Sequence, residues 1–292
     1  MLRRVASFLV PFALLLAGPA AAFALNINNS FRPQDEFKLD PWFSIGPIEF
    51  NKAVFYVIVA TALTCLTMIY VARRMQTRPN RVQTAVEFAY TGIRDNITRG
   101  NMDDQMAAKW FPFIAAIFLF IWFSNMLGYL PLPTNTEHKV DIFGLEVPTF
   151  ALFAATANLS VPLVLTVMVW LSYHVEGIRR KGFVPYLKGW IPAGVEGPAR
   201  IPIFAIEVIS HFVRIISLSV RLFANILAGH LLILFMAGGL AVLLGVAALG
   251  WFTLPAAVAF YIFEVGLVAT LQAFIFATLT AIYFGGAVEA HH

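Results

Sequence analysis

Long runs without a charged side chain are the feature of this sequence that most limits its possible folds. Residues 53–72 form a run of 20 residues without Asp, Glu, Lys or Arg. At a rise of 1.5 Å per residue, such a helix spans about 30 Å, the thickness of the hydrocarbon core of a bilayer. Charged residues make up only 12% of the chain, roughly half their share in a soluble domain. The chain is therefore expected to be a membrane protein with several spans.

Four further apolar stretches complete the prediction of an all-α protein with five transmembrane helices. The predicted spans are residues 53–72, 111–132, 150–173, 203–244 and 255–284. The fourth is unusual because no strong helix breaker follows Pro202 before the pair Gly238-Gly239. A helix over the whole of 201–244 would measure roughly 66 Å, so it must tilt steeply or break at the glycines. With the fifth span it is expected to form a long C-terminal hairpin.

The distribution of basic residues predicts which side of the membrane each loop faces. Residues 73–110 carry seven Lys or Arg residues and residues 174–200 carry five, whereas residues 131–149 carry one. Because basic residues concentrate in cytoplasmic loops, the first two loops are expected in the cytoplasm and the third outside. Counting five spans then places the C-terminus in the cytoplasm.

An amphipathic pattern lies within the first basic loop. Val86, Tyr90, Ile93 and Ile97 recur at helical spacing, with charged residues on the other faces. This pattern predicts a short helix on the cytoplasmic membrane surface. An ordinary solvated loop is the alternative.

The N-terminus has the pattern of an export signal. Two arginines precede a short apolar stretch, and a cluster of small residues offers cleavage sites. Residues 1–24 are predicted to be a signal peptide, or alternatively an uncleaved anchor, followed by one membrane domain over residues 25–292. In both cases Asn26 lies outside. A bacterial inner membrane is favoured over that of an organelle.

Composition and spacing argue against several other kinds of site. The net charge of +4 is spread over loops beside apolar spans, without a basic arm or groove, so nucleic acid is not an expected partner. The single cysteine, Cys65, lies in an apolar stretch, and the spacing of a zinc or iron–sulfur site is missing. His211 and His230 lie 19 residues apart on one predicted helix, which does not suit haem ligation. We expect no cofactor and no metal.

Ionisable side chains at membrane depth are confined to the C-terminal hairpin. They are Glu207, His211, Arg214, Arg221, His230 and Glu264. Such groups are costly in hydrocarbon and usually serve a function. Glu207, His211 and Arg214 lie near the cytoplasmic entrance, where long side chains can reach the interface. They are candidates either for local pairing and anchoring or for an ion path.

Arg221 is the strongest functional candidate. It lies about 20 residues beyond the cytoplasmic loop, and its guanidinium stays protonated. It belongs to a helical stripe at i, i+4, i+7 spacing that runs from Glu207 to Asn225 and Ala228. No acid lies close to it on that stripe, so its partner must come from another helix or another chain. A structural ion pair with Glu264 is the alternative.

His230 and Glu264 are candidates for proton transfer. His230 lies nine residues after Arg221, about 180° around the helix. On the other arm Glu264 and Gln272 lie eight residues apart, about 80° around the helix. Antiparallel arms would let His230 and Glu264 face each other across a wet crevice, which suits a proton relay. A static hydrogen-bonded pair is the alternative.

Two motifs resemble a known family. The segment from Ser217 to His230, Ser-Leu-Ser-Val-Arg-Leu-Phe-Ala-Asn-Ile-Leu-Ala-Gly-His, resembles the signature of subunit a of F-type ATP synthases. The segment that starts at Leu271, Leu-Gln-Ala-Phe-Ile-Phe-Ala-Thr-Leu-Thr, resembles the final helix of that family. The similarity covers most of the chain, including residues 82–97, residues 125–133 and the layout of five spans.

The resemblance implies roles for five residues. Arg221 corresponds to the essential stator arginine of the family, and Asn225 and Gln272 to its polar companions. His230 occupies a position that holds Glu in some members and His in others. Glu264 lies about one residue from the place of the complementary group, so its role is less firmly assigned.

The resemblance also implies a mechanism and partners. The expected function is that of a non-catalytic channel subunit, with Arg221 between two aqueous half-channels and facing a ring of subunits that each carry a membrane carboxylate. Protons would enter past Asn225, His230, Glu264 and Gln272 and leave to the cytoplasm. The expected partners are this c-ring, the peripheral-stalk subunit b, protons and membrane lipid. A sodium-translocating version of the same subunit is the alternative.

Two other classes of protein fit less well. A secondary transporter would have inverted repeats, and five spans do not divide into matching halves. A structural subunit of a respiratory complex would not explain a lone arginine in mid-membrane.

Overall fold

The computed structural model describes residue 39 and residues 41–45, 48–74, 81–142, 145–191, 197–239 and 250–288. The predicted signal segment, residues 1–24, lies outside the described residues, so its prediction stays open.

Five long apolar helices are the main elements of the fold over the described residues, which confirms the predicted fold class. They are α2 (Lys52–Arg74), α4 (Asp104–Gly128), α5 (Ser160–Lys181), α7 (Arg200–Leu234) and the last helix, made of α9 (Gly250–Phe263), the π-helical segment η7 (Glu264–Val268) and α10 (Ala269–Val288). All five are long and apolar enough to cross a membrane. The fourth continues from α7 into a π-helical segment, η5 (Phe235–Gly239). Residues 240–249 lie outside the described residues, so the predicted break near the glycine pair stays a prediction.

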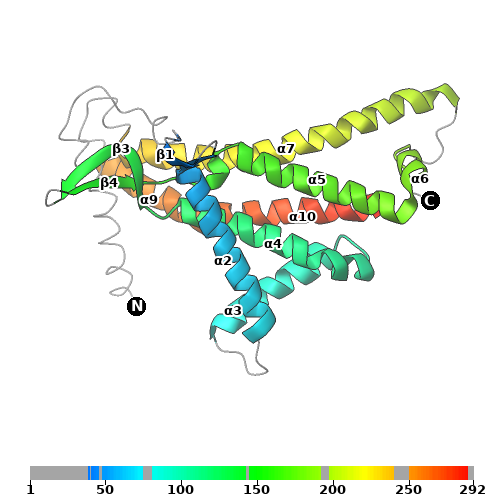
Figure 1. The fold of residues 1–292 in the computed structure, drawn as a ribbon, viewed down its shortest axis with the longest axis horizontal. Coiled ribbons are helices and arrows are strands. Elements are labelled where there is room, and N and C mark those ends of the chain that lie inside the picture. Colours follow the sequence, from blue (N-terminus) through cyan, green and yellow to red (C-terminus); the bar gives the residue numbers. More distant parts are fainter. Residues whose placement is uncertain are drawn as a thin grey trace.

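The arrangement follows from which helix faces are apolar and which carry small residues. Helices α5, α7 and α9–α10 run along the long axis of the molecule, whereas α2 crosses them steeply (Figure 1). Helix α10 packs against α4 and α5, and α7 packs against α5. Small buried residues recur every fourth position on α10, namely Ala269, Ala273, Ala277, Ala281 and Gly285. Such a stripe lets helix backbones approach closely in a membrane.

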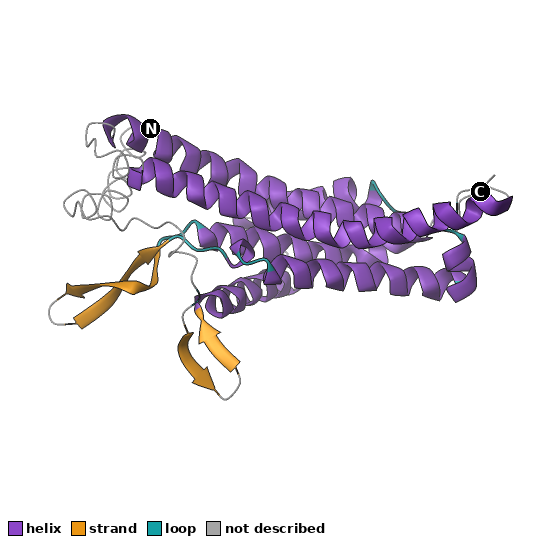
Figure 2. Cartoon of the chain, turned by 90° about the horizontal axis from the view of Figure 1, so that it is seen from above, coloured by secondary structure: helices purple, strands orange, loops and turns teal. Residues whose placement is uncertain are grey.

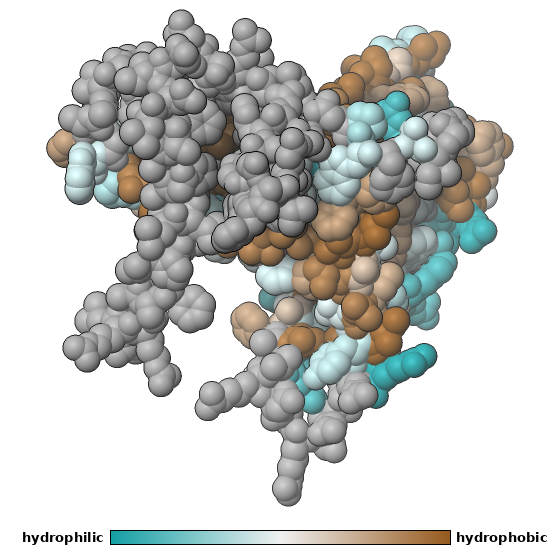
Figure 3. All heavy atoms as spheres, turned by 60° about the vertical axis from the view of Figure 1, so that its left-hand side comes forward, coloured by the Kyte–Doolittle hydropathy of each residue, from teal (hydrophilic) through white to brown (hydrophobic). Residues whose placement is uncertain are grey.

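The outer surface of the helices is apolar, as lipid requires. Leu66 of α2, Val164 of α5 and Ile206 of α7 are each more than 60% exposed. Apolar side chains form much of the described surface in Figure 3. Exposed apolar surface of this extent fits lipid rather than water as the solvent of the helices.

The third span differs from its prediction. Residues 150–173 were expected to be helical, but α5 begins at Ser160 and ends at Lys181. Residues 152–154 are instead buried irregular chain, and they are followed by one buried turn of 3₁₀ helix, η3 (Ala155–Ala157). A Cβ added at Gly128 would lie only 2.3 Å from the Cβ of Ala154. The Asn158 side chain accepts a hydrogen bond from the Ser160 amide just before the helix. Apolar composition alone does not distinguish this buried loop from a helix.

Helix α5 extends beyond its apolar run because its charges are paired. Glu176, only 2% exposed, accepts a hydrogen bond from Lys109 Nζ at 2.6 Å and lies 3.4 Å from Arg180 Nε. The helix ends at Gly182, whose φ of +84° favours glycine. The short helix α6 (Phe183–Lys188) then folds back.

Two β-hairpins were not predicted. Strands β1 (Pro41–Ile45) and β2 (Ile48–Asn51) form one antiparallel pair, and β3 (Leu132–Ile142) and β4 (Leu145–Ala151) form another. Both lie at the same end of the long helices (Figure 2). Sequence analysis assigned both segments to the outer side of the membrane, and their shared position agrees with that prediction without testing which side it is.

The amphipathic segment is helical, but its apolar face is used differently from the prediction. It forms α3 (Arg81–Thr91) and the π-helical segment η2 (Gly92–Arg99). Ile93 and Ile97 are buried in the core against α4 and α10. Tyr90 packs edge-on against Phe111 of α4 at 4.8 Å between ring centroids. The stripe therefore contacts protein, and not only lipid.

Candidate functional site

Arg221 lies on the outer face of α7. Its neighbour Leu222 is fully buried in the core, whereas Arg221 itself is exposed. None of the acidic residues within the described ranges forms an ion pair with it. The alternative pair with Glu264 is not formed, because that carboxylate contacts Tyr129. A permanent cation is thus presented to whatever packs on this face.

The stripe that contains Arg221 does not keep one environment along α7. His211 is buried and Glu207 and Arg214 are partly buried, whereas Arg221 and Asn225 are exposed. Helix rotation does not explain the change, because the 18 residues from Glu207 to Asn225 make about five full turns. The change arises from the neighbouring elements, since α5 and Trp190, just after α6, cover the stripe only at its first part.

Asn225 and Gln272 meet between the two arms of the hairpin. Asn225 Nδ2 donates a hydrogen bond to Gln272 Oε1 at 2.8 Å. Asn225 lies one helical turn beyond Arg221, and Gln272 is buried on α10. The two residues that the sequence paired by resemblance are therefore brought together beside the exposed cation.

His230 and Glu264 are joined through a third side chain, Tyr129, at the end of α4. The Tyr129 hydroxyl donates a hydrogen bond to Glu264 Oε2 at 2.9 Å, and its ring stacks on His230 at 4.7 Å. Tyr261 in turn donates to the Tyr129 carbonyl at 2.6 Å. His230 and Glu264, which were expected to face each other, are thus linked through Tyr129 by one ring stack and one hydrogen bond.

Both ring nitrogens of the buried His230 face carbonyl oxygens. Nδ1 lies 2.8 Å from Ile226 O and Nε2 lies 3.0 Å from Gly128 O. A neutral imidazole has one N–H and can donate to only one of these acceptors, whereas an imidazolium donates to both. A neutral His230 therefore leaves one of these two carbonyl oxygens without a hydrogen bond from its ring.

A π-helical segment aligns Glu264 with Gln272. In a regular helix their eight-residue spacing separates them by about 80°. Segment η7 begins at Glu264 and absorbs about one residue, which reduces the separation to about 20°. Both side chains are accordingly buried on the same side of the last helix. Sequence counting missed this local change of helix period.

Gly229 makes room for the Glu264 carboxylate. A Cβ at Gly229 would lie 2.5 Å from Glu264 Oε2 and 2.6 Å from its Cδ. Real Cβ contacts are not that short. The pair Gly229-His230 thus places the histidine and the space for the carboxylate side by side.

Further buried polar groups connect α4 to the last helix. Thr156 Oγ1 donates to Asn125 Oδ1 at 2.8 Å, and Asn125 Nδ2 lies 3.4 Å from the carbonyl oxygen of Ala269. Trp122 Nε1 donates to Thr270 Oγ1 at 3.2 Å. Sequence analysis assigned no role to these residues or to Tyr129. The only available signal was the motif Asn-Met-Leu-Gly-Tyr that starts at Asn125. This motif is part of the family resemblance, but it contains no charged residue that would mark it as a site.

A second polar cluster surrounds His211 between α5, α6 and α7. His211 Nε2 lies 3.7 Å from Glu207 Oε1, which also accepts from Arg214 at 3.4 Å. On its other side, His211 Nδ1 lies 3.1 Å from the Tyr173 hydroxyl. Glu207 thus contacts both of the other candidates that were predicted to lie near the cytoplasmic entrance.

The cluster continues beyond His211 through a second histidine. The rings of His174 and His211 lie 4.8 Å apart, and His174 Nδ1 lies 2.6 Å from the Tyr186 hydroxyl. Burial raises the pKa of Tyr186, so its hydroxyl remains a donor. No group of three or more His, Cys, Asp and Glu side chains suited to a metal occurs within the described ranges.

Comparisons with known proteins agree on one family. The family model described as ATP synthase A chain matches residues 54–285. The ATP synthase subunit a of Bradyrhizobium diazoefficiens is 33% identical over 270 residues, which cover 89% of this chain and 98% of the relative. That of Rubrobacter xylanophilus is 34% identical over 249 residues, covering 84% and 87%. That of Pelagibacter ubique is 31% identical over 271 residues, covering 92% and 100%.

Proposed function

The chain belongs to the ATP synthase A chain family, and we propose that Arg221 is the cation past which the ring carboxylates move. In this family the chain is subunit a, the proton-channel stator subunit of the membrane sector. The supporting observation is the position of Arg221, which is exposed on the outer face of α7 without an ion pair to any described residue. A carboxylate on a neighbouring chain can reach it from that face.

A fixed cation at this place would perform two tasks. It would favour the ionised form of a passing carboxylate and so promote release of its proton. It would also repel protons and keep the two aqueous half-channels apart. A protonated carboxylate is neutral and can turn through lipid at low cost, whereas an ionised one cannot. Proton flow is thereby coupled to movement of the ring.

We assign one half-channel to the linked side chains of His230, Tyr129 and Glu264. These side chains form a buried polar series between α4, α7 and the last helix. The Asn225–Gln272 hydrogen bond lies between this series and Arg221 along α7. In this proposal protons enter at the end of the molecule where the two β-hairpins lie and pass along the series to a ring carboxylate.

We assign the other half-channel to Glu207, His211 and Arg214. Their mutual contacts lie toward the opposite end of α7. The proposed topology places this end of α7 and the C-terminus in the cytoplasm of a bacterial cell. It places the two β-hairpins on the outer side of the inner membrane. The c-ring and the peripheral-stalk subunit b are the proposed partners.

Site-directed cross-linking tests which face of α7 meets the ring. With exposed Cys65 first replaced by serine, Ala224→Cys lies on the outer face beside Arg221, whereas Ala273→Cys is fully buried on α10. A cysteine placed next to the ring carboxylate should form a cross-link with position 224 and none with position 273. Cross-linking at neither position, in an assembled complex, would contradict the proposed interface.

Gly229→Ala should lower ATP-driven proton pumping by about tenfold, because the new methyl group displaces the Glu264 carboxylate from Tyr129. The measurement is acidification of membrane vesicles on addition of ATP. Gly266→Ala on the last helix is the matched control, since a Cβ there has open space. Equal pumping by the two variants would show that the position of this carboxylate does not matter.

A further inference from the structure

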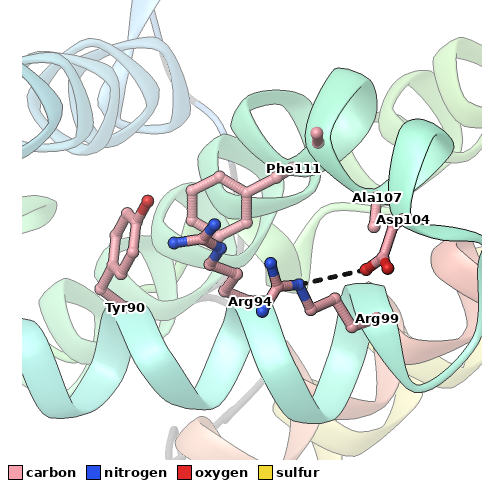
Figure 4. A pocket seen from close by; sticks show the side chains of 7 residues that line it. Tyr90, Arg94, Arg99, Asp104, Ala107 and Phe111 are labelled. Carbon is pink, nitrogen blue, oxygen red and sulfur yellow. Dashed lines mark ion pairs between the residues drawn. The ribbon is translucent and has the colours of Figure 1, made fainter.

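A small open cavity lies between η2 and the start of α4, outside the proposed proton path. Its volume is about 140 Å³. Its walls come from Tyr90, Arg94, Arg99, Asp104, Ala107, Ala108 and Phe111 (Figure 4). Because the span Asp104–Gly128 begins at its edge, the cavity lies at the level where a helix enters the membrane.

The cavity holds one cation without a counter-charge. Arg99 lies 3.3 Å from Asp95 and 3.5 Å from Asp104, so the acidic group on the wall is already paired. Arg94 is exposed and forms no ion pair with any residue in the described ranges; its guanidinium lies 6.0 Å from the centre of the Tyr90 ring. The cavity therefore favours an anion with several acceptor oxygens.

The wall of the cavity that α4 forms is apolar. Ala108 is exposed and Phe111 is partly buried one turn further into the span. Tyr90 packs edge-on against Phe111, so the aromatic wall is continuous from α3 to α4. A ligand that carries a phosphate at one end and a hydrocarbon chain at the other would match both parts.

We propose that this cavity binds an anionic phospholipid, with its phosphate on Arg94 and an acyl chain along Phe111. A guanidinium recognises phosphate oxygens through several N–H donors. Basic pockets at the ends of membrane helices suit anionic headgroups. A zwitterionic lipid has the same phosphate, but its ammonium group would meet Arg99 and find no free carboxylate. The lipid would tie η2 to α4 and so hold the amphipathic segment at the membrane surface.

Photo-crosslinking of lipid in the intact complex tests the proposal. The complex is reconstituted in phosphatidylcholine vesicles that contain a small share of phosphatidylglycerol with a photoreactive acyl chain. Label on the peptide that contains Phe111 is measured by mass spectrometry relative to label on α2. Phosphatidylcholine with the same acyl chain is the headgroup control. We expect the anionic probe to label this peptide about fivefold more, as one arginine near the surface provides.

Two variants and one competitor decide the outcome. Arg94→Gln removes the unpaired charge, and Ala108→Trp fills the cavity without changing the charge. In each variant, labelling by the phosphatidylglycerol probe should fall to the level given by the phosphatidylcholine probe. Arg73→Gln, at the exposed end of α2, removes an equal charge outside the cavity and should leave the excess unchanged. Equal loss in Arg94→Gln and Arg73→Gln would overturn the site in favour of general surface charge. Abolition of the label by millimolar inorganic phosphate would overturn the lipid as its ligand.

Discussion

Arg221→Gln is expected to stop ATP-driven proton pumping while the complex still assembles. The amide keeps much of the side-chain volume but has no charge to favour the ionised form of a ring carboxylate. Loss of one preorganised charge at a reacting group commonly lowers rates by about a hundredfold or more. Pumping is measured in inverted membrane vesicles with a pH-sensitive dye, and assembly by co-purification of the subunits.

The passive proton permeability of the same vesicles separates the two tasks of the cation. If Arg221 also keeps the half-channels apart, Arg221→Gln should leak protons faster than the parent once an imposed gradient is released. Arg221→Lys keeps the charge but not the planar set of donors, so it should block the leak while pumping slowly. Arg179→Gln, which removes a charge from the exposed end of α5, is the control. Normal pumping by Arg221→Gln would refute the role of the arginine.

The sequence was most informative where physical costs are large. An arginine or a glutamate in an apolar run is conspicuous because charge is expensive in hydrocarbon, so Arg221 and Glu264 could be found by inspection. The same cost, applied to whole segments, predicted the number of spans. Sidedness of the loops rests on basic residues alone and remains a prediction.

Features that carry no charge were not predictable. Tyr129 follows the end of α4, where aromatic residues are common at membrane interfaces, so nothing distinguished it as a link between His230 and Glu264. The π-helical segment at Glu264–Val268 contains no proline, and its local change of helix period leaves no sequence pattern. Residues 152–157 are as apolar as a span, although they fold as buried irregular chain and one turn of 3₁₀ helix. Each of these depends on tertiary packing.

Glu264→Gln should reduce ATP-driven proton pumping by about a hundredfold, the second largest effect expected. The amide accepts the hydrogen bond from Tyr129 and fits the space at Gly229, so packing is retained. It cannot take up and release a proton, and positioned acid–base groups commonly contribute factors of about 10² to 10⁴. The same vesicle assay measures the loss, and Thr270→Val on the same helix serves as a structural control.

Coupling between Glu264 and His230 distinguishes a proton relay from a static pair. If the two act in one series through Tyr129, His230→Gln should cost about as much as Glu264→Gln, and the double variant should lose little more than either. Independent roles would give losses that multiply. Tyr129→Phe keeps the ring stacked on His230 but removes the hydroxyl from Glu264. In a relay it should reproduce a large part of the Glu264→Gln loss, whereas a purely structural tyrosine would leave the rate near that of the parent and lower only the thermal stability.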